Sequence, residues 1–359
     1  MKILTKYIIR EIMGPLLFGL FAFTSMFMGV VFLQLLRDAE KYKMTAWFII
    51  KLLMLRMPEY IMQAAPIAVL LGALLGLGRL TSHSESIAMR ASGVSIYRLA
   101  YPVILIGALV SIGGILLNEY VVPGAVRSSE QMKSTASQNV SATIHHFYRD
   151  FYDQDQLQKL VYADRYEPKS EAMYGVTIQE FAKGRLSRTI EAAHLYWKGE
   201  NWFFNDGRIY EYFSDNFYPI TVSRGQVQYD LDLTPAEIKQ LKEDPDKKSI
   251  SELNRYIQRF ATQGNEKNRL LVDLHMKMAI PVASFILALL GTPLALRPQR
   301  RSNAAGFGLC IIFILVWYIF MGIGMYMGRV GILPPFLGAW LPNIILALYG
   351  LNVFRTVKS

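Results

Sequence analysis

The sequence predicts an α-helical polytopic membrane protein with six transmembrane helices, divided three and three by an inserted all-β domain. A helix needs about 20 apolar residues to cross the hydrocarbon core of a bilayer. Six runs without Asp, Glu, Lys or Arg meet that length, and a long polar stretch separates the third run from the fourth. The runs lie near residues 12–36, 60–78, 99–118, 278–296, 304–328 and 330–354.

Composition agrees with this class and excludes a nucleic-acid partner. The chain has 359 residues, of which 52% are hydrophobic, and a formal net charge of +10. Between Arg127 and Asp273 there are 20 basic and 22 acidic residues, so the basic excess lies entirely in the membrane segments and their flanks. There it meets lipid headgroups and sets topology.

The distribution of Lys and Arg predicts that both termini are cytoplasmic. With the N-terminus inside, the cytoplasmic pieces carry eleven basic residues and the short outer pieces carry six. The cytoplasmic residues are Lys2, Lys6, Arg10, Arg79, Arg90, Arg98, Arg297, Arg300, Arg301, Arg355 and Lys358, and the outer ones are Arg37, Lys41, Lys43, Lys51, Arg56 and Arg329. We therefore divide the chain into helices one to three (1–119), an extracytoplasmic domain (120–270) and helices four to six (271–359).

The first outer loop is unusually basic and continues into an apolar segment, residues 44–58. This segment is either an interfacial helix or an outward extension of the second span. Arg37, Lys41 and Arg56 either reach out to headgroups or bind the phosphates of an anionic lipid. Their position on the outer side, against the positive-inside trend, favours a function.

The central domain is predicted to be a β-sandwich or jelly roll. Its segments are rich in aromatic and β-branched residues and are punctuated by Gly, Asn, Asp and Pro, as in KLVYADRYEP and NWFFNDGRIYEYF. A helix is expected to follow over 249–263, with Ser249 and Glu252 as a capping box and Gly264 as its C-cap.

The loop between the second and third spans, residues 81–95, predicts a short amphipathic cytoplasmic helix. Thr81, Ser82 or Ser84 could cap it, and Gly93 should end it. Such a helix either lies on the membrane surface or docks into a groove of a soluble partner. The residues that would face this partner are Ser84, Glu85, Ile87, Ala88, Met89, Arg90 and Gly93.

Catalytic signatures are missing from the sequence. It contains neither a Walker A pattern nor HExxH, and its single cysteine, Cys310, lies within an apolar run. The apolar runs contain no Asp, Glu, His or Lys of the kind that ion-coupled carriers use. We therefore expect no enzyme activity and no bound metal or cofactor in this chain, and any transport would draw its energy from a partner.

Four segments in order resemble the lipopolysaccharide export permeases (the LptF/LptG, or YjgP/YjgQ, family), and the resemblance covers nearly the whole chain. The most specific is PIAVLLGALLGLGRLTSHSESIAMRASGVS at 66–95. The others are SISELNRYIQRF at 249–260, MAIPVASFILALLGTPLAL at 278–296 and LPPFLGAWLPNIILALYGL near the C-terminus. The motifs do not distinguish the F type from the G type.

The resemblance implies a permease subunit of an ABC transporter in the bacterial inner membrane, with a periplasmic β-jelly roll. Two permeases pair above a cytoplasmic ATPase dimer, which holds ATP and magnesium. The complex extracts lipopolysaccharide from the outer leaflet and passes it to single-span and periplasmic bridge proteins. The coupling acid of the family falls on Glu85. Glu59 departs from the pattern, because one subunit type has a lysine there. The alternative function is a membrane scaffold or ABC-like signalling subunit whose outer domain binds a partner.

The resemblance also implies a lateral gate between spans one and five. Glycines would keep these helices slim at a facing seam. They are Gly14 and Gly19 in span one, and Gly306, Gly308, Gly322, Gly324 and Gly328 in and around span five. Acyl chains would enter at this seam while Arg37, Lys41 and Arg56 hold the phosphates of the lipid.

Overall fold

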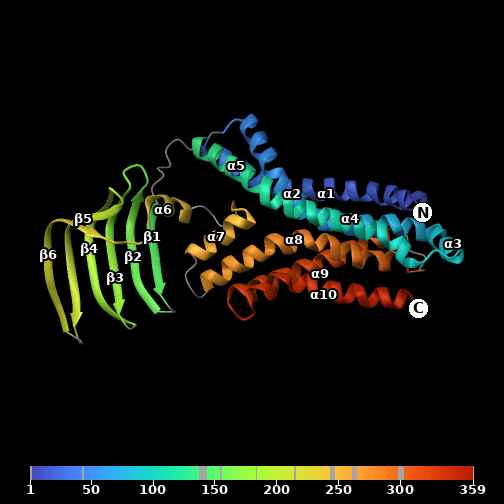
Figure 1. The fold of residues 1–359 in the computed structure, drawn as a ribbon. Helices are drawn as coiled ribbons and strands as arrows, with labels where there is room; N and C mark the ends of the chain where they lie inside the picture. The colour runs from blue at the N-terminus through green and yellow to red at the C-terminus, as the bar shows by residue number, and fades with distance from the viewer. Residues whose placement is uncertain are drawn as a thin grey trace. The chain divides into compact units, whose positions relative to one another are not determined.

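The structure is a computed structural model in which two compact units are distinguished (Figure 1). The helical unit comprises residues 1–136, 246–258 and 265–359, and the β unit comprises 137–245 and 259–264. The helical unit includes two segments, 122–136 and most of 250–260, that lie within the predicted central domain, 120–270. The residues described are 2–42, 44–136, 144–153, 156–182, 184–213, 216–242, 247–260, 265–297 and 303–358.

The helical unit contains six candidate membrane spans within the described residues, which confirms the predicted fold class. Its long helices are α1 (Lys2–Tyr42), α2 (Ala46–Ser82), α4 (Ile96–Leu116), α8 (Asn265–Ala295), α9 (Asn303–Arg329) and α10 (Pro335–Lys358). Because α2 is continuous from Ala46, the apolar segment 44–58 is mostly an outward extension of the second span. At 1.5 Å per residue, helices of this length exceed a hydrocarbon core of about 30 Å.

The spans differ in how far the unit itself covers them. In the most apolar windows of α2 and α8, 72% of residues are buried, against 22% for α1 and 11% for α9. Large apolar side chains such as Phe21 on α1 and Ile319 on α9 are exposed. The unit is therefore built around α2 and α8, and α1 and α9 present apolar faces that lipid or another protein must cover.

The irregular third span contacts α8 around a proline. Pro281 lacks an N–H, so the carbonyl of Lys277 loses its helical donor. The third span passes from α4 through a π-helical turn, η1 (Leu117–Val121), into α5 (Val122–Ala136). Within that turn Asn118 Nδ2 donates to the Lys277 carbonyl at 2.8 Å. Ser111 Oγ donates to the Pro281 carbonyl at 2.9 Å and accepts from the Phe285 N–H at 3.1 Å. The carbonyl that Pro281 leaves without a helical donor is thus satisfied from within the unit.

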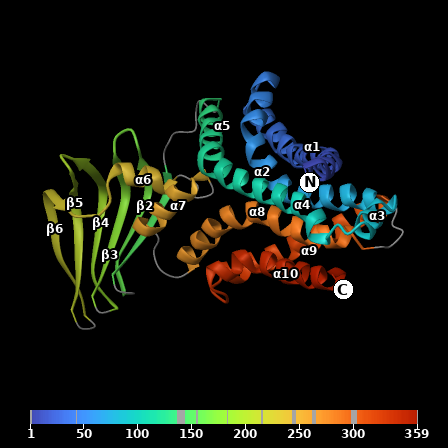
Figure 2. The same ribbon diagram turned by 45° about the vertical axis from the view of Figure 1, so that its right-hand side comes forward.

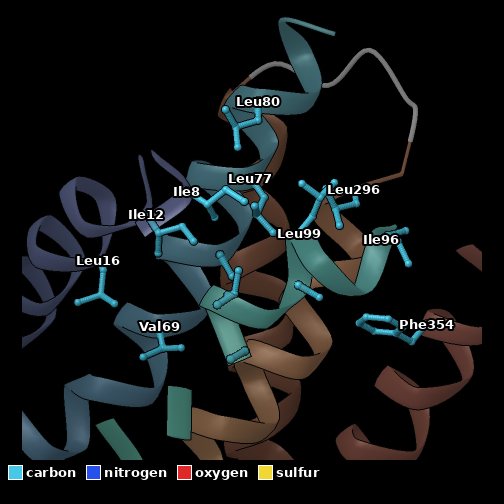
Figure 3. Packing of buried hydrophobic residues seen from close by; sticks show 14 residues of the cluster. Ile8, Ile12, Leu16, Val69, Leu77, Leu80, Ile96, Leu99, Leu296 and Phe354 are labelled. Atoms are coloured by element: carbon cyan, nitrogen blue, oxygen red, sulfur yellow. The ribbon is translucent and has the colours of Figure 1, made fainter. Parts of the chain in front are cut away.

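One apolar cluster gathers the helix ends at the side of both chain termini (Figure 3). It includes Ile8 near the start of α1, Leu80 at the end of α2, Ile96 at the start of α4, Leu296 just after α8 and Phe354 near the end of α10. We call this side the terminal end of the helical unit. The loop between α2 and α4 therefore lies at the same end as both termini, as the turned view also shows (Figure 2).

The opposite end is organised around a second cluster and helix α7 (Ile250–Phe260). Val31 and Leu35 of α1 pack there with Ile49 and Leu52 of α2, and Met132 of α5 packs against them. The chain leaves the unit toward the β unit after Ala136, the last residue of α5. We call this side the β-linked end.

The predicted capping box of α7 is present. The Ser249 N–H donates to Glu252 Oε2 at 3.0 Å, and the Glu252 N–H donates to Ser249 Oγ at 3.1 Å. Arg127 of α5 also pairs with Glu252. Burial alone would raise the pKa of Glu252, but the Ser249 N–H and the Arg127 guanidinium lower it overall. The predicted continuation to 263 and the cap at Gly264 lie outside the described residues.

The β unit contains a six-stranded antiparallel sheet with the strands in sequential order (Figure 1). The strands are β1 (Ile144–Asp153), β2 (Gln156–Glu167), β3 (Ala172–Ala182), β4 (Arg185–Lys198), β5 (Asn201–Phe213) and β6 (Asn216–Tyr229). The inserted all-β domain is confirmed by this sheet, and its jelly-roll character stays a prediction.

One face of the sheet is apolar and is covered by the chain that follows β6. In the register of β2, β3 and β4, Val161 lies beside Ile178 and Ile178 beside Ile190, and all three are buried. Trp202 Nε1 donates to the Leu233 carbonyl, and Lys159 Nζ to the Asp230 carbonyl at 3.1 Å. These bonds place the segment after β6 across the sheet, where Leu231, Leu233 and Ile238 are buried. Helix α6 (Pro235–Lys242) follows, with Thr234 and Glu237 as a second capping box.

Candidate functional site

The predicted loop helix exists as α3 (Glu85–Ala91), at the terminal end of the helical unit. It is shorter than the predicted segment 81–95, because Thr81 and Ser82 belong to the end of α2. Ser84 is the N-cap residue in a left-handed conformation, and its side chain makes no capping hydrogen bond. Gly93 ends the helix as predicted, with φ of +89°. The Gly93 N–H bonds to the Arg90 carbonyl and the Val94 N–H to the Met89 carbonyl, which is a Schellman motif.

α3 presents one face to the unit and one to the solvent. Ser86 is buried and donates to Thr81 Oγ1 at 3.2 Å, and Met89 packs against the cluster of the terminal end. Ile87 is 48% exposed, and Ala88 and Arg90 are exposed as well. Met89 thus anchors α3, whereas Ile87, Ala88 and Arg90 are available to a partner.

Two polar contacts connect this region to α1. The Tyr7 hydroxyl donates to Glu85 Oε2 at 2.8 Å. One turn further along α1, Glu11 Oε1 accepts from Arg79 Nη1 of α2 at 3.3 Å. Glu85 therefore has a defined position at the start of α3, and its carboxylate keeps acceptor capacity for a further donor. Sequence reasoning missed Tyr7, because no local pattern connects two residues 78 positions apart.

The three predicted phosphate-binding cations are placed differently from one another. Arg37 is exposed on α1, toward the β-linked end. Arg56 is half-buried and donates to Glu59 Oε2 at 3.3 Å, one turn further along α2. The side chain of Lys41 lies outside the described residues. Glu59, the departure from the family pattern, thus partly neutralises Arg56.

The glycines of the predicted seam have different neighbours. A Cβ on Gly19 would meet Leu71 and Ala68 of α2, and one on Gly306 would meet Leu75 of α2. Gly324 and Gly328 face Gly338 of α10, and Gly328 also faces Val272 of α8. For Gly14, Gly308 and Gly322 nothing lies within 4 Å. Within one chain, four of these glycines therefore mediate packing onto α2, α8 and α10, and three lie on open surface.

An ion pair on the helical unit was not anticipated from the sequence. Asp273 of α8 is 8% exposed and accepts from Arg329 Nη2, at the end of α9, at 2.6 Å. A second set of bonds adds α10: Trp317 Nε1 of α9 donates to Asn343 Oδ1 of α10 at 3.2 Å, and Asn343 Nδ2 donates to the Ala279 carbonyl of α8 at 2.7 Å. These bonds fix α9 and α10 on α8. Asp273 could have been found only by noticing that α8 starts well before its uncharged run.

Comparisons with known proteins bear on the whole chain. The family model "Lipopolysaccharide export system permease LptF/LptG" matches residues 6–356. The lipopolysaccharide export system permease protein LptG of Escherichia coli K12 is 24% identical over 350 residues, covering 95% of this chain and 94% of that protein. The LptG protein of Haemophilus influenzae is 22% identical over 358 residues, covering 95% of each chain.

Proposed function

Since the chain belongs to the LptF/LptG family of lipopolysaccharide export permeases, we propose that it is a permease subunit of an ABC transporter that extracts lipopolysaccharide from the outer leaflet of the inner membrane. It would work beside a second permease of the same family, or a second copy, above a cytoplasmic ATPase dimer. ATP and magnesium would be bound by that dimer. Single-span and periplasmic bridge proteins would receive the lipid.

The observation that carries this proposal is α3. It lies at the end of the helical unit that also holds both termini, and it displays an acid, an apolar side chain and a base, namely Glu85, Ile87 and Arg90. An exposed helix with this mixture suits docking into a groove, where the apolar side chain fills the pocket and the charges fix the register. A chain without a nucleotide-binding motif needs such a contact to receive work from ATP hydrolysis.

The orientation follows from the Lys/Arg asymmetry. The terminal end would face the cytoplasm, and the β unit, which is inserted at the opposite end, would be periplasmic. Single cysteines at Asn201 and Ser302, introduced after Cys310 is replaced by serine, should respond oppositely to an impermeant thiol reagent. Labelling at 201 but not at 302 in cells with a permeabilised outer membrane is expected, and the reverse pattern would contradict the orientation.

The lipid path would use the two uncovered helices. α1 and α9 carry exposed apolar side chains that can contact acyl chains, and their glycines at Gly14, Gly308 and Gly322 lie on open surface. When two permeases pair, α1 of one can face α9 of the other and form the lateral gate. Arg37, Lys41 and Arg56 would hold the phosphates of the lipid at the outer headgroup level.

Charge reversal at the docking acid tests the proposal. Glu85→Arg should abolish association with the ATPase and lipid export while the protein still inserts into the membrane, because a buried interfacial charge pair would become a repulsion. Glu200→Arg makes the same charge change in a turn of the β unit and should leave association intact. Association and export are read by co-purification in mild detergent and by lipid release from proteoliposomes. Full association and export with Glu85→Arg would overturn the assignment of Glu85 as the docking acid.

A further inference from the structure

The first two turns of α1 contact α3, although α1 is not adjacent to α3 in the sequence. α3 follows α2 and precedes α4, so covalent connections alone would transmit its movement to those two helices. The Tyr7 hydroxyl adds a hydrogen bond of 2.8 Å from α1 to Glu85, the first residue of α3. Leu4 and Ile8 of α1 and Met89 of α3 belong to the same apolar cluster.

Further along, α1 is packed closely on α2. A Cβ on Gly76 would lie 2.9 Å from Ile12 Cα, and one on Gly72 would lie 2.9 Å from Leu16 Cβ. Only glycine permits this approach, so α1 and α2 are held as a pair from about Ile12 to Leu16. Before Ile12, the buried Ile8 keeps α1 in the apolar cluster, and two partly exposed polar contacts are added, namely Tyr7 with Glu85 and Glu11 with Arg79. The start of α1 is therefore connected to α3 by a polar contact that can change as well as by apolar packing.

We propose that Tyr7 is a positioning residue, which ties the docking acid Glu85 to α1 so that displacement of α3 by the ATPase moves the uncovered helix α1. This inference rests on the proposed function. One carboxylate offers acceptor positions to several donors, so Glu85 can keep the Tyr7 hydroxyl while it receives a cation from the ATPase. Tyr7 then transmits force and adds nothing to docking itself.

Tyr7→Phe removes the hydroxyl and keeps the ring, and therefore tests this tie directly. We would purify the full chain with its ATPase and second permease and place the complex in proteoliposomes containing lipopolysaccharide. Lipid extracted and ATP hydrolysed would be measured in the same sample. We expect Tyr7→Phe to retain ATPase association and ATP hydrolysis, and to extract about fivefold less lipid per ATP, the factor that a hydrogen bond of ordinary strength corresponds to.

Three further variants make the result specific. Tyr101→Phe, at an exposed tyrosine of α4, should leave the ratio of lipid to ATP unchanged. Glu85→Leu should lower the ratio, and adding Tyr7→Phe to it should lower the ratio no further, because the hydroxyl then has no acceptor at position 85. The temperature at which Cys310 becomes reactive to a fluorogenic thiol dye reports the fold of the helical unit, since Cys310 is buried and is the chain's single cysteine.

The outcomes separate this inference from the proposed function. A wild-type complex that extracts no lipopolysaccharide would overturn the proposed function and this inference together. A transporting wild type with an unchanged ratio in Tyr7→Phe would overturn this inference alone. Loss of ATPase association in Tyr7→Phe, or a lowered temperature of Cys310 labelling, would also overturn it, because Tyr7 would then serve docking or folding.

Discussion

In the helical unit, polar side chains are buried where helices pack on one another, whereas among the described residues of the β unit the buried side chains are nearly all apolar. Asn118, Ser111 and Asn343 each bond to a backbone carbonyl of α8. In the β unit, Val161, Ile178 and Ile190 are neighbours on adjacent strands and all three are buried. The difference follows from the solvent. Water expels an apolar face, but lipid does not, so spans are held together by satisfied hydrogen bonds and close packing.

The largest effect is expected from the removal of a buried aromatic side chain in the β unit. Trp202 is 1% exposed and donates its Nε1–H to the Leu233 carbonyl. Trp202→Ala should destabilise the β unit by about 3–5 kcal/mol, because it opens a cavity and leaves that carbonyl without its donor. Limited proteolysis of the full chain in detergent should cleave the β unit faster, while Cys310 labelling should keep its midpoint temperature. Tyr148→Ala, at a side chain that is 58% exposed, is the control. A lowered Cys310 midpoint in Trp202→Ala would show that the two units do not unfold separately.

The second prediction concerns a buried hydrogen bond in the helical unit. Asn118→Leu keeps the size of the side chain and removes the donor to the Lys277 carbonyl. We expect a loss of about 2–3 kcal/mol, since an unsatisfied carbonyl within a span finds no water. The midpoint of Cys310 labelling should fall and proteolysis of the β unit should not change. Asn352→Leu, at an exposed position on α10, is the matched control. Equal midpoints for the two variants would show that the hydrogen bond from Asn118 to the Lys277 carbonyl contributes nothing to stability.

The third prediction sharpens the role of close packing, by comparing two glycines of α9. A Cβ on Gly324 would overlap the Gly338 carbonyl of α10, whereas one on Gly322 would meet nothing within 4 Å. Gly324→Ala should cost about 1–2 kcal/mol through overpacking. Gly322→Ala should be neutral or stabilise by up to about 1 kcal/mol through helix propensity. The midpoint temperature of Cys310 labelling measures both changes in stability. A change of the same sign in the two variants would contradict the distinction between a closely packed glycine and one on open surface.

The sequence was informative where one physical effect dominates a long segment. Uncharged runs predicted all six spans, and aromatic and β-branched segments predicted the β domain. The helices extend beyond the runs because polar residues continue a helix once it has left the hydrocarbon core. This is why Asp273, counted with the polar domain, belongs to α8 and pairs with Arg329.

The candidate site was predictable in location but less so in detail. The pattern around Gly93 predicted a helix and its end, and the Schellman motif confirms that end. It did not predict that Met89 faces inward, because a helix of 7 residues is too short for periodicity to fix its faces. The contacts of Tyr7 and Asn118 could not be predicted from the sequence, since each residue bonds to one more than 70 positions away and neither belongs to a motif. The roles of Glu85, of the outer cations and of the seam glycines stay predictions.

The smallest effect is expected at a helix-capping glutamate that pairs with an arginine, an arrangement found in both units. Glu252 in the helical unit and Glu237 in the β unit each close a capping box and pair with an arginine, Arg127 and Arg259 respectively. Burial would raise the pKa of each carboxyl, but backbone N–H donors and the arginines lower both overall. A lowered pKa in the folded state contributes stability above the ordinary glutamate pKa, and this contribution is lost as the pH falls through the lowered value.

Replacing each glutamate by a neutral glutamine should therefore lower the stability of both units. Glu252→Gln and Glu237→Gln keep an acceptor for the cap and remove the charge. Each should lower stability at pH 7 by less than about 1 kcal/mol, as is usual for partly exposed pairs. The difference from wild type should shrink as the pH approaches 4 and below, because the wild-type carboxyl then becomes protonated. Thermal unfolding followed by tryptophan fluorescence at several pH values measures this, with Glu200→Gln in an exposed turn as control. A difference that grows toward acid pH would show that these carboxylates are not stabilised by their caps and arginines. An effect confined to Glu237 would show that the capping box of α7 contributes nothing to the helical unit.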